Sequence, residues 1–299
     1  MSQDAERQVP TYDELLAQLP DAMPRLHRSL SAADSNRRNN LQRFLPGILL
    51  PGLEELLTYL DTICKAFEED ERLKPIVFLV RRLVFDFEAS LEAALIGNFS
   101  VVTDLMRDVM EVELLLTDFT FHESHMDQWL RSAPRKRQRH FGPGKIRKRL
   151  RDIGWDRYSE SVAGVDYRAH SESLHVSPPI HPFFGKGYTP ANELTRDACF
   201  WDIFEHGRRI LEAIEIIRDM RAGSDWGDVP HTKDLENVRV AWQRTRRMQA
   251  MYIALIRAPS ELRKELGRQP TIDEVVQKVR DQFAERSDSE THEPPQEST

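Results

Sequence analysis

The residues best suited to chemistry lie in one short segment, YRAHSESLH, which runs from Tyr167 to His175. Arg168 and His175 form an R-x6-H pair, and Ser171 and Glu172 lie between them. A histidine exchanges protons near neutral pH, and an arginine stabilises the negative charge that builds on a phosphorus centre. The pattern therefore predicts cleavage of a phosphodiester, with Ser171 or Glu172 orienting the histidine.

A helix over about residues 158–176 must position this segment. At the angular step of an α-helix, Arg168, Ser171, Glu172 and His175 share one flank, next to an apolar stripe. Arg168 and His175 are two turns, or about 10.5 Å, apart along the axis. The alternative is structural: Arg168 and Glu172 form an ordinary i,i+4 ion pair, and His175 only ends the helix.

The second candidate site is a basic segment, residues 131–151, with ten Lys or Arg and no Asp or Glu. Its candidate nucleic-acid-binding residues are Arg135, Lys136, Arg137, Arg139, Lys145, Arg147 and Lys148. Such a segment attracts phosphate backbones without reading the base sequence. Phe141 and Trp155 are close enough in sequence to stack on bases. The alternative is a solvated surface that pairs with the acidic remainder of the chain.

Arg107 and Glu111 are supporting candidates, one helical turn apart and facing away from the main apolar stripe of their helix. They form either a solvated ion pair or part of the cleft that holds Arg168. We expect no bound metal and no cofactor. His122 and His125 flank Glu123 without a familiar ligand spacing.

The elements that position these residues are predicted to be helices, because apolar residues recur at steps of three and four. The predicted helices cover about residues 53–67, 75–97, 101–116, 158–176, 193–220, 235–257, 260–266 and 271–284. A short helix should also precede Pro20, and residues 34–40 should form a loop. The short connection at 98–100 makes its two flanking helices antiparallel neighbours.

This pattern predicts an all-α protein, an antiparallel helical bundle with extra C-terminal helices. We expect a polar and partly disordered N-terminal segment (1–40) and a helical bundle (41–222) that includes the basic segment. C-terminal helices (223–286) and a disordered tail (287–299) follow.

The composition excludes several classes of protein. Hydrophobic residues make up 40% of the 299 residues, enough for a core, and the net charge of −7 argues against a protein that coats nucleic acid with its whole surface. Cys64 and Cys199 are the only cysteines, so a disulfide framework is not expected. Without an apolar leader or a membrane-spanning apolar run, we expect a cytoplasmic protein that does not enter the membrane.

The Y-x3-S-x3-H spacing of Tyr167, Ser171 and His175, the Val-Ser-Pro that follows it, and the upstream Arg107-x3-Glu111 resemble the HEPN superfamily. The chain resembles in particular a bacterial branch described only as a domain of unknown function. The resemblance covers about residues 75–220.

The resemblance implies a helical bundle that is often dimeric, and a metal-independent ribonuclease that uses an R-x4-6-H motif. Arg168 and His175 match this motif, whereas Ala169 stands where many members have a polar residue. The leading hypothesis is thus a homodimer that binds and cleaves RNA. The alternative is a non-catalytic helical scaffold or regulator that binds a protein or nucleotide partner.

Overall fold

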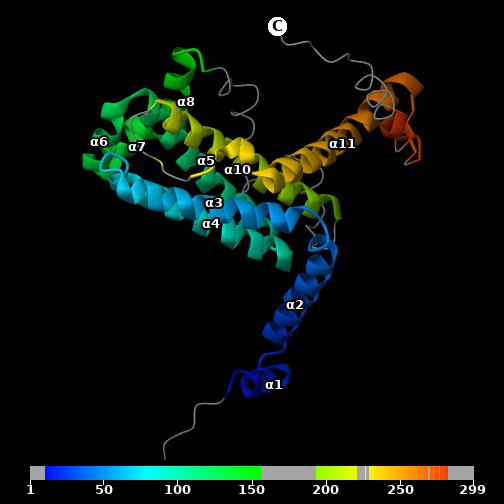
Figure 1. Ribbon diagram of the computed structural model, residues 1–299. Helices are drawn as coiled ribbons and strands as arrows, with labels where there is room; N and C mark the ends of the chain where they lie inside the picture. Colours follow the sequence, from blue (N-terminus) through cyan, green and yellow to red (C-terminus); the bar gives the residue numbers. More distant parts are fainter. Residues whose placement is uncertain are drawn as a thin grey trace, which may run out of the picture.

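The computed structural model describes residues 11–155, 193–220, 226, 229–268, 270–271, 273–275 and 277–281. The all-α prediction is confirmed: the described residues form helices and contain no strand (Figure 1). The α-helices are α1 (Tyr12–Ala22), α2 (Pro24–Phe44), α3 (Leu49–Glu69), α4 (Val77–Ile96), α5 (Phe99–Phe121), α6 (Glu123–Arg131), α7 (Pro134–Phe141), α8 (Pro143–Asp152), α10 (Glu193–Met220) and α11 (Glu236–Leu266). Two short 3-10 helices, η1 (Lys74–Ile76) and η3 (Thr232–Asp234), precede α4 and α11.

The core lies between α3, α4, α5 and α10, the long helices of the bundle. Its largest fully buried side chains are aromatic: Phe67, Phe87, Phe99, Phe200 and Phe204. These residues fall on the apolar stripes of their helices, so burying the stripes requires that the helices pack side by side. Within the described part of the chain, no helix is both long and apolar enough to cross a membrane.

The predicted antiparallel pair is present as α4 and α5. Gly97 ends α4 in the left-handed conformation, with φ of 82°. The Asn98 amide donates a hydrogen bond to the Ala93 carbonyl at 2.7 Å, which satisfies one of the open carbonyls at the helix end. The chain then reverses, and α5 begins at Phe99.

The N-terminal residues differ from the prediction. The helix expected to stop before Pro20 continues through it to Ala22, and the expected loop at 34–40 lies within α2. The end of α2 is held by tertiary contacts, because the Asn40 side chain donates to the Leu95 carbonyl at 2.7 Å and the Asn36 side chain to that of Ile96 at 3.0 Å. These acceptors lie at the C-terminal end of α4, which explains why local sequence did not reveal the helix.

The C-terminal helices also differ from the sequence prediction in one respect. The expected break between 257 and 260 is absent, and α11 continues from Glu236 to Leu266. Ala258 and Leu262, on either side of the proline at 259, are both buried. Packing of these two residues offsets the cost of a proline inside a helix.

Candidate functional site

The candidate residues of the YRAHSESLH segment lie outside the described residues: the catalytic candidates Arg168, Ser171, Glu172 and His175, and the supporting Tyr167. The R-x6-H site therefore stays a prediction. The described residues that bear on function are those of the basic segment, which folds into α7 and α8. Gly142 joins the two helices in an extended conformation, and Pro143 starts α8 at the position where proline is favoured.

The two basic helices are anchored by apolar side chains. Phe141, Ile146 and Leu150 are buried in the core, whereas Lys145 and Lys148 between them are exposed. Phe141 is only 7% exposed, so the prediction that it stacks on bases is wrong. The half-buried Trp155 packs on Phe121, with ring centroids 5.0 Å apart, which also makes it part of the fold.

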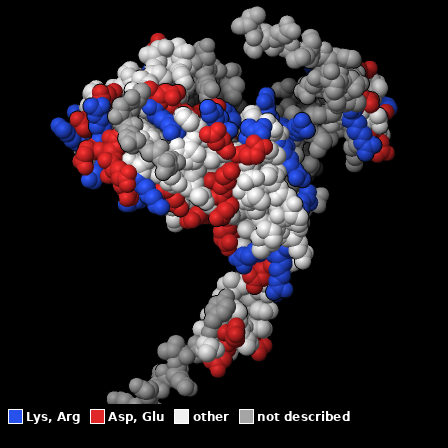
Figure 2. Space-filling view, viewed as in Figure 1, with Lys and Arg blue, Asp and Glu red and all other residues white. Residues whose placement is uncertain are grey.

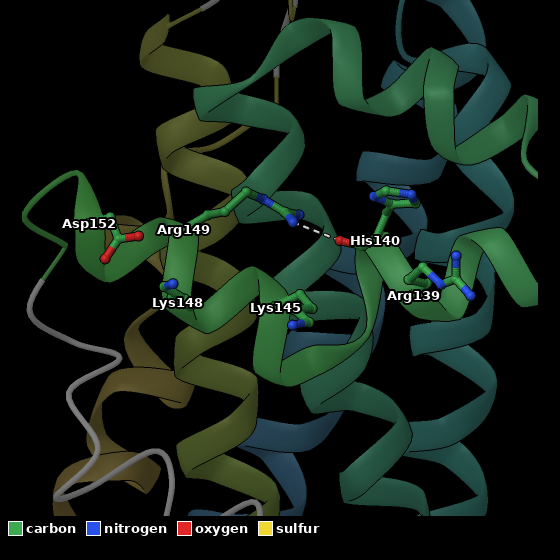
Figure 3. A pocket seen from close by; sticks show the side chains of 6 residues that line it. All are labelled: Arg139, His140, Lys145, Lys148, Arg149 and Asp152. Carbon is green, nitrogen blue, oxygen red and sulfur yellow. Dashed lines mark hydrogen bonds between the residues drawn. The ribbon is translucent and has the colours of Figure 1, made fainter.

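A buried ion pair ties α8 to α5. Asp118 is fully buried, and Arg149 binds it through two hydrogen bonds, from Nε to Oδ1 at 3.0 Å and from Nη2 to Oδ2 at 2.7 Å. Arg149 Nη1 donates a third bond to the carbonyl of His140 at 2.6 Å, drawn as the dashed line in Figure 3. A buried carboxylate requires such partners, and the paired fork fixes the orientation of α8.

Histidines complete the environment of this carboxylate. His125 Nδ1 lies 3.0 Å from Asp118 Oδ2, and the ring of His122 packs on that of His125 with centroids 4.6 Å apart. His125 in turn meets the Phe141 ring edge-on at 5.7 Å. The first turn of α6, the end of α5 and α8 therefore meet at Asp118, and α7 packs against this cluster through Phe141.

An open pocket of about 430 Å³ lies beside this anchor (Figure 3), and Arg139, His140, Lys145, Lys148, Arg149 and Asp152 line it. Four of these residues lie on one face of α8, because Lys148 and Arg149 are each three or four positions from Lys145 and Asp152. The guanidinium of Arg149 is already committed to Asp118. Arg139, Lys145 and Lys148 are exposed, and none of them forms an ion pair within the described part of the chain.

The other basic candidates divide between exposed and structural roles. Arg135 and Lys136 are exposed on α7. Arg137 donates to the carbonyls of Trp129 and Ser132 at 3.2 and 3.1 Å, and its guanidinium lies 4.6 Å from the Trp129 ring centroid. Arg147 is half-buried. We therefore assign Arg137 to the fold rather than to phosphate binding.

Arg107 and Glu111 form the expected i,i+4 ion pair on α5 at 3.1 Å, with side chains 30% and 38% exposed. Whether they also share a cleft with Arg168 depends on residues outside the described range.

Sequence reasoning missed Asp118 and did not single out Arg149 within the basic segment. Asp118 sits among buried residues near the end of α5, where it interrupts the apolar pattern of the helix. The usable signal was a carboxylate four residues before His122 and seven before His125.

The chain as a whole is not basic, because its formal net charge is −7. On the face drawn in Figure 2, blue and red side chains are interspersed over the bundle. Comparison of the chain with protein-family models, curated proteins and solved structures found no match. The functional argument therefore rests on the residues themselves.

Proposed function

We propose that this protein binds RNA through its phosphate backbone at the α7–α8 pocket. The observation that carries the proposal is the convergence of Arg139, Lys145 and Lys148 on one open pocket. Charges that are not paired inside the protein are available to phosphates. Each phosphate contact releases counterions, which supplies binding free energy that does not depend on base sequence.

The Asp118–Arg149 pair supports this role indirectly. Arg149 pairs with the buried Asp118 carboxylate beneath α8, so this carboxylate does not compete for the exposed cations of that helix. The pocket contains one acidic residue, Asp152, at the far end of α8. A backbone phosphate would therefore lie nearer Arg139 and Lys145.

The proposed reaction is metal-independent cleavage of the bound RNA by the predicted R-x6-H segment. His175 removes the proton of a ribose 2′-hydroxyl, and the oxygen attacks the adjacent phosphorus. Arg168 stabilises the charge on the phosphorane-like transition state. The bond between phosphorus and the 5′-oxygen breaks, and the leaving oxygen takes a proton from solvent, so the products carry a 2′,3′-cyclic phosphate and a 5′-hydroxyl. Support comes from the sequence motif and its HEPN resemblance, and the resemblance also suggests a homodimer.

The binding proposal is tested by fluorescence anisotropy with two unrelated single-stranded RNA oligonucleotides. The triple variant Arg139→Gln, Lys145→Gln, Lys148→Gln should bind both RNAs at least about tenfold more weakly. The slope of log affinity against log salt should flatten by about 0.7 for each lost contact.

The matched control removes the same charge from exposed positions elsewhere, with Arg25→Gln, Arg28→Gln and Lys65→Gln. It should bind RNA nearly as well as wild type, because screening weakens distant charges. Equal losses in both variants would show that net charge, and not the pocket, controls binding.

One observation favours a second function, a helical scaffold for a protein partner. The N-terminal arm, formed by α1 and the first half of α2, extends away from the bundle (Figure 1). It exposes Leu15, Met23, Leu26 and Leu30 at 37–56%. Exposed apolar residues in a group are typical of partner-binding surfaces. A wild-type protein that neither binds nor cuts RNA would favour this function.

A further inference from the structure

A cluster of metal-ligating side chains lies at the corner between α5 and α6. Asp118, His122 and His125 each offer one ligand atom, and these atoms all lie within 4.8 Å of one another. We propose that this cluster binds a divalent transition-metal ion. The inference is independent of RNA binding and of the R-x6-H segment.

The corner itself brings the three residues together. The His122 amide donates to the Asp118 carbonyl at 2.9 Å, which closes the last turn of α5, and the His125 amide donates to the His122 carbonyl at 2.8 Å. His122 stands between the helices with φ of −135° and ψ of 80°. The chain bends at this residue. The side chains of His122 and His125, four and seven positions after Asp118, face the same point as the Asp118 carboxylate. Positions i, i+4 and i+7 also share one face of an uninterrupted helix, and the bend at His122 keeps the three ligand atoms close together.

The distances suit first-row metal coordination. Bonds of 2.0–2.1 Å in a tetrahedral site place neighbouring ligand atoms about 3.3 Å apart. His125 Nδ1 and Asp118 Oδ2 are 3.0 Å apart, close to one edge of such a tetrahedron. A metal ion would replace the proton that these two atoms share, and His122 would swing in by a side-chain rotation.

His122 adds an independent observation. Its Nε2 atom is buried and has no hydrogen-bond partner among the described residues. A buried polar atom left without a partner costs on the order of 1–3 kcal/mol. A metal ion near this ring would use a nitrogen lone pair and offset part of that cost.

The contacts of Arg149 with Asp118 limit the affinity that we expect for a metal ion. A carboxylate has about four lone-pair positions; Arg149 occupies one on each oxygen, and His125 occupies a third. Replacing only the His125 contact leaves Arg149 as an outer partner that holds the carboxylate, as in many metal sites. Its positive charge also opposes the cation, so we expect micromolar binding, weaker than at a structural zinc site.

The donor set indicates which ions bind. Imidazole favours Zn²⁺, Ni²⁺ and Cu²⁺, whereas Mg²⁺ and Ca²⁺ prefer oxygen ligands alone. Three protein ligands would leave a fourth position of a tetrahedral ion open to water or an anion.

The test is titration of the chelator-treated, desalted full chain with ZnCl₂ by calorimetry, and with CoCl₂ by visible absorption. His122→Gln and His125→Gln should each weaken Zn²⁺ binding at least tenfold and remove the absorption of tetrahedral Co²⁺. His27→Gln, a histidine of α2 outside the cluster, should behave as wild type. MgCl₂ should produce no binding heat.

His122→Gln leaves the Asp118–His125–Arg149 contacts in place, so it provides a folded variant whose helicity circular dichroism can verify. If this variant binds Zn²⁺ with the stoichiometry and affinity of wild type, the cluster is not a metal site. The proposal is equally overturned if wild type binds no Zn²⁺.

Discussion

At the scale of single residues, the most consequential side chain is Asp118, because three elements meet at its carboxylate. Asp118→Asn should lower the free energy of unfolding by on the order of 2 kcal/mol, since Arg149 loses the charge it was placed to neutralise. Urea denaturation followed by circular dichroism measures this change.

The matched control is Asp127→Asn, which removes a carboxylate from an exposed i,i+4 pair with Arg131 at 3.6 Å. An exposed pair contributes little, so the loss should stay below about 1 kcal/mol. Equal losses would mean that burial of Asp118 does not determine its contribution.

Asp86 should make stability depend on pH. Burial raises the pKa of its carboxyl from 3.8 to about 6, and Arg82, 3.6 Å away, only partly opposes this. The folded state holds this proton more tightly than the unfolded state, so the contribution of Asp86 to stability declines as pH rises from about 4 to 6. Asp86→Asn should therefore be more stable than wild type above pH 6, by on the order of 1–3 kcal/mol.

The measurement for Asp86 is the difference in unfolding free energy between variant and wild type from pH 4 to pH 7. Other titrating groups cancel in this difference. A difference that stays constant with pH would contradict the raised pKa.

The proposed cleavage depends on two residues. His175→Ala should reduce RNA cleavage by about 10²–10⁴-fold, because a general acid or base is lost. Arg168→Lys should also lose most of the RNA cleavage, since an ammonium group cannot reproduce the two-pronged hydrogen bonding of a guanidinium group. Gel analysis should detect 2′,3′-cyclic phosphate ends in wild-type reactions, and a chelator should not change the rate. If the His175→Ala variant cleaves RNA as fast as wild type, His175 is not the general acid or base.

At the scale of elements, the contact between α3 and α11 depends on a glycine. A Cβ atom at Gly52 would lie 2.7 Å from the Ala241 Cβ and 3.0 Å from the Asn237 carbonyl oxygen. Gly52→Ala should therefore push the two helices apart and cost about 1–3 kcal/mol of stability, despite the better helix propensity of alanine.

Gly144→Ala is the control, because no atom lies within 4 Å of its Cβ position in the first turn of α8. It should be neutral or stabilising by up to about 1 kcal/mol. Urea unfolding measures the free energy of unfolding of both variants. If the two substitutions change it by similar amounts, the close approach of α3 and α11 at Gly52 is excluded.

At the scale of the whole molecule, the HEPN resemblance predicts self-association about a two-fold axis, which would bring two R-x6-H segments together. Light scattering at tens of micromolar should give a mass near twice 34.8 kDa. A monomer at that concentration would argue against a composite site shared by two chains.

The sequence by itself determined that this protein is helical and where most helices lie. The apolar period of α3, α4, α5 and α10 is local, and Gly97 marks a chain reversal through its own backbone freedom. Both signals act within a few residues, so no knowledge of the rest of the fold is needed.

Only the tertiary structure decided which polar residues act together. Arg149 and Asp118 are 31 residues apart, and their pairing depends on how α8 crosses α5. The same crossing buries Phe141, which the sequence suggested for base stacking. Asn40 likewise holds α2 through carbonyls at the end of α4. Such contacts arise from helix packing, whose angles and registers are set by many side chains at once.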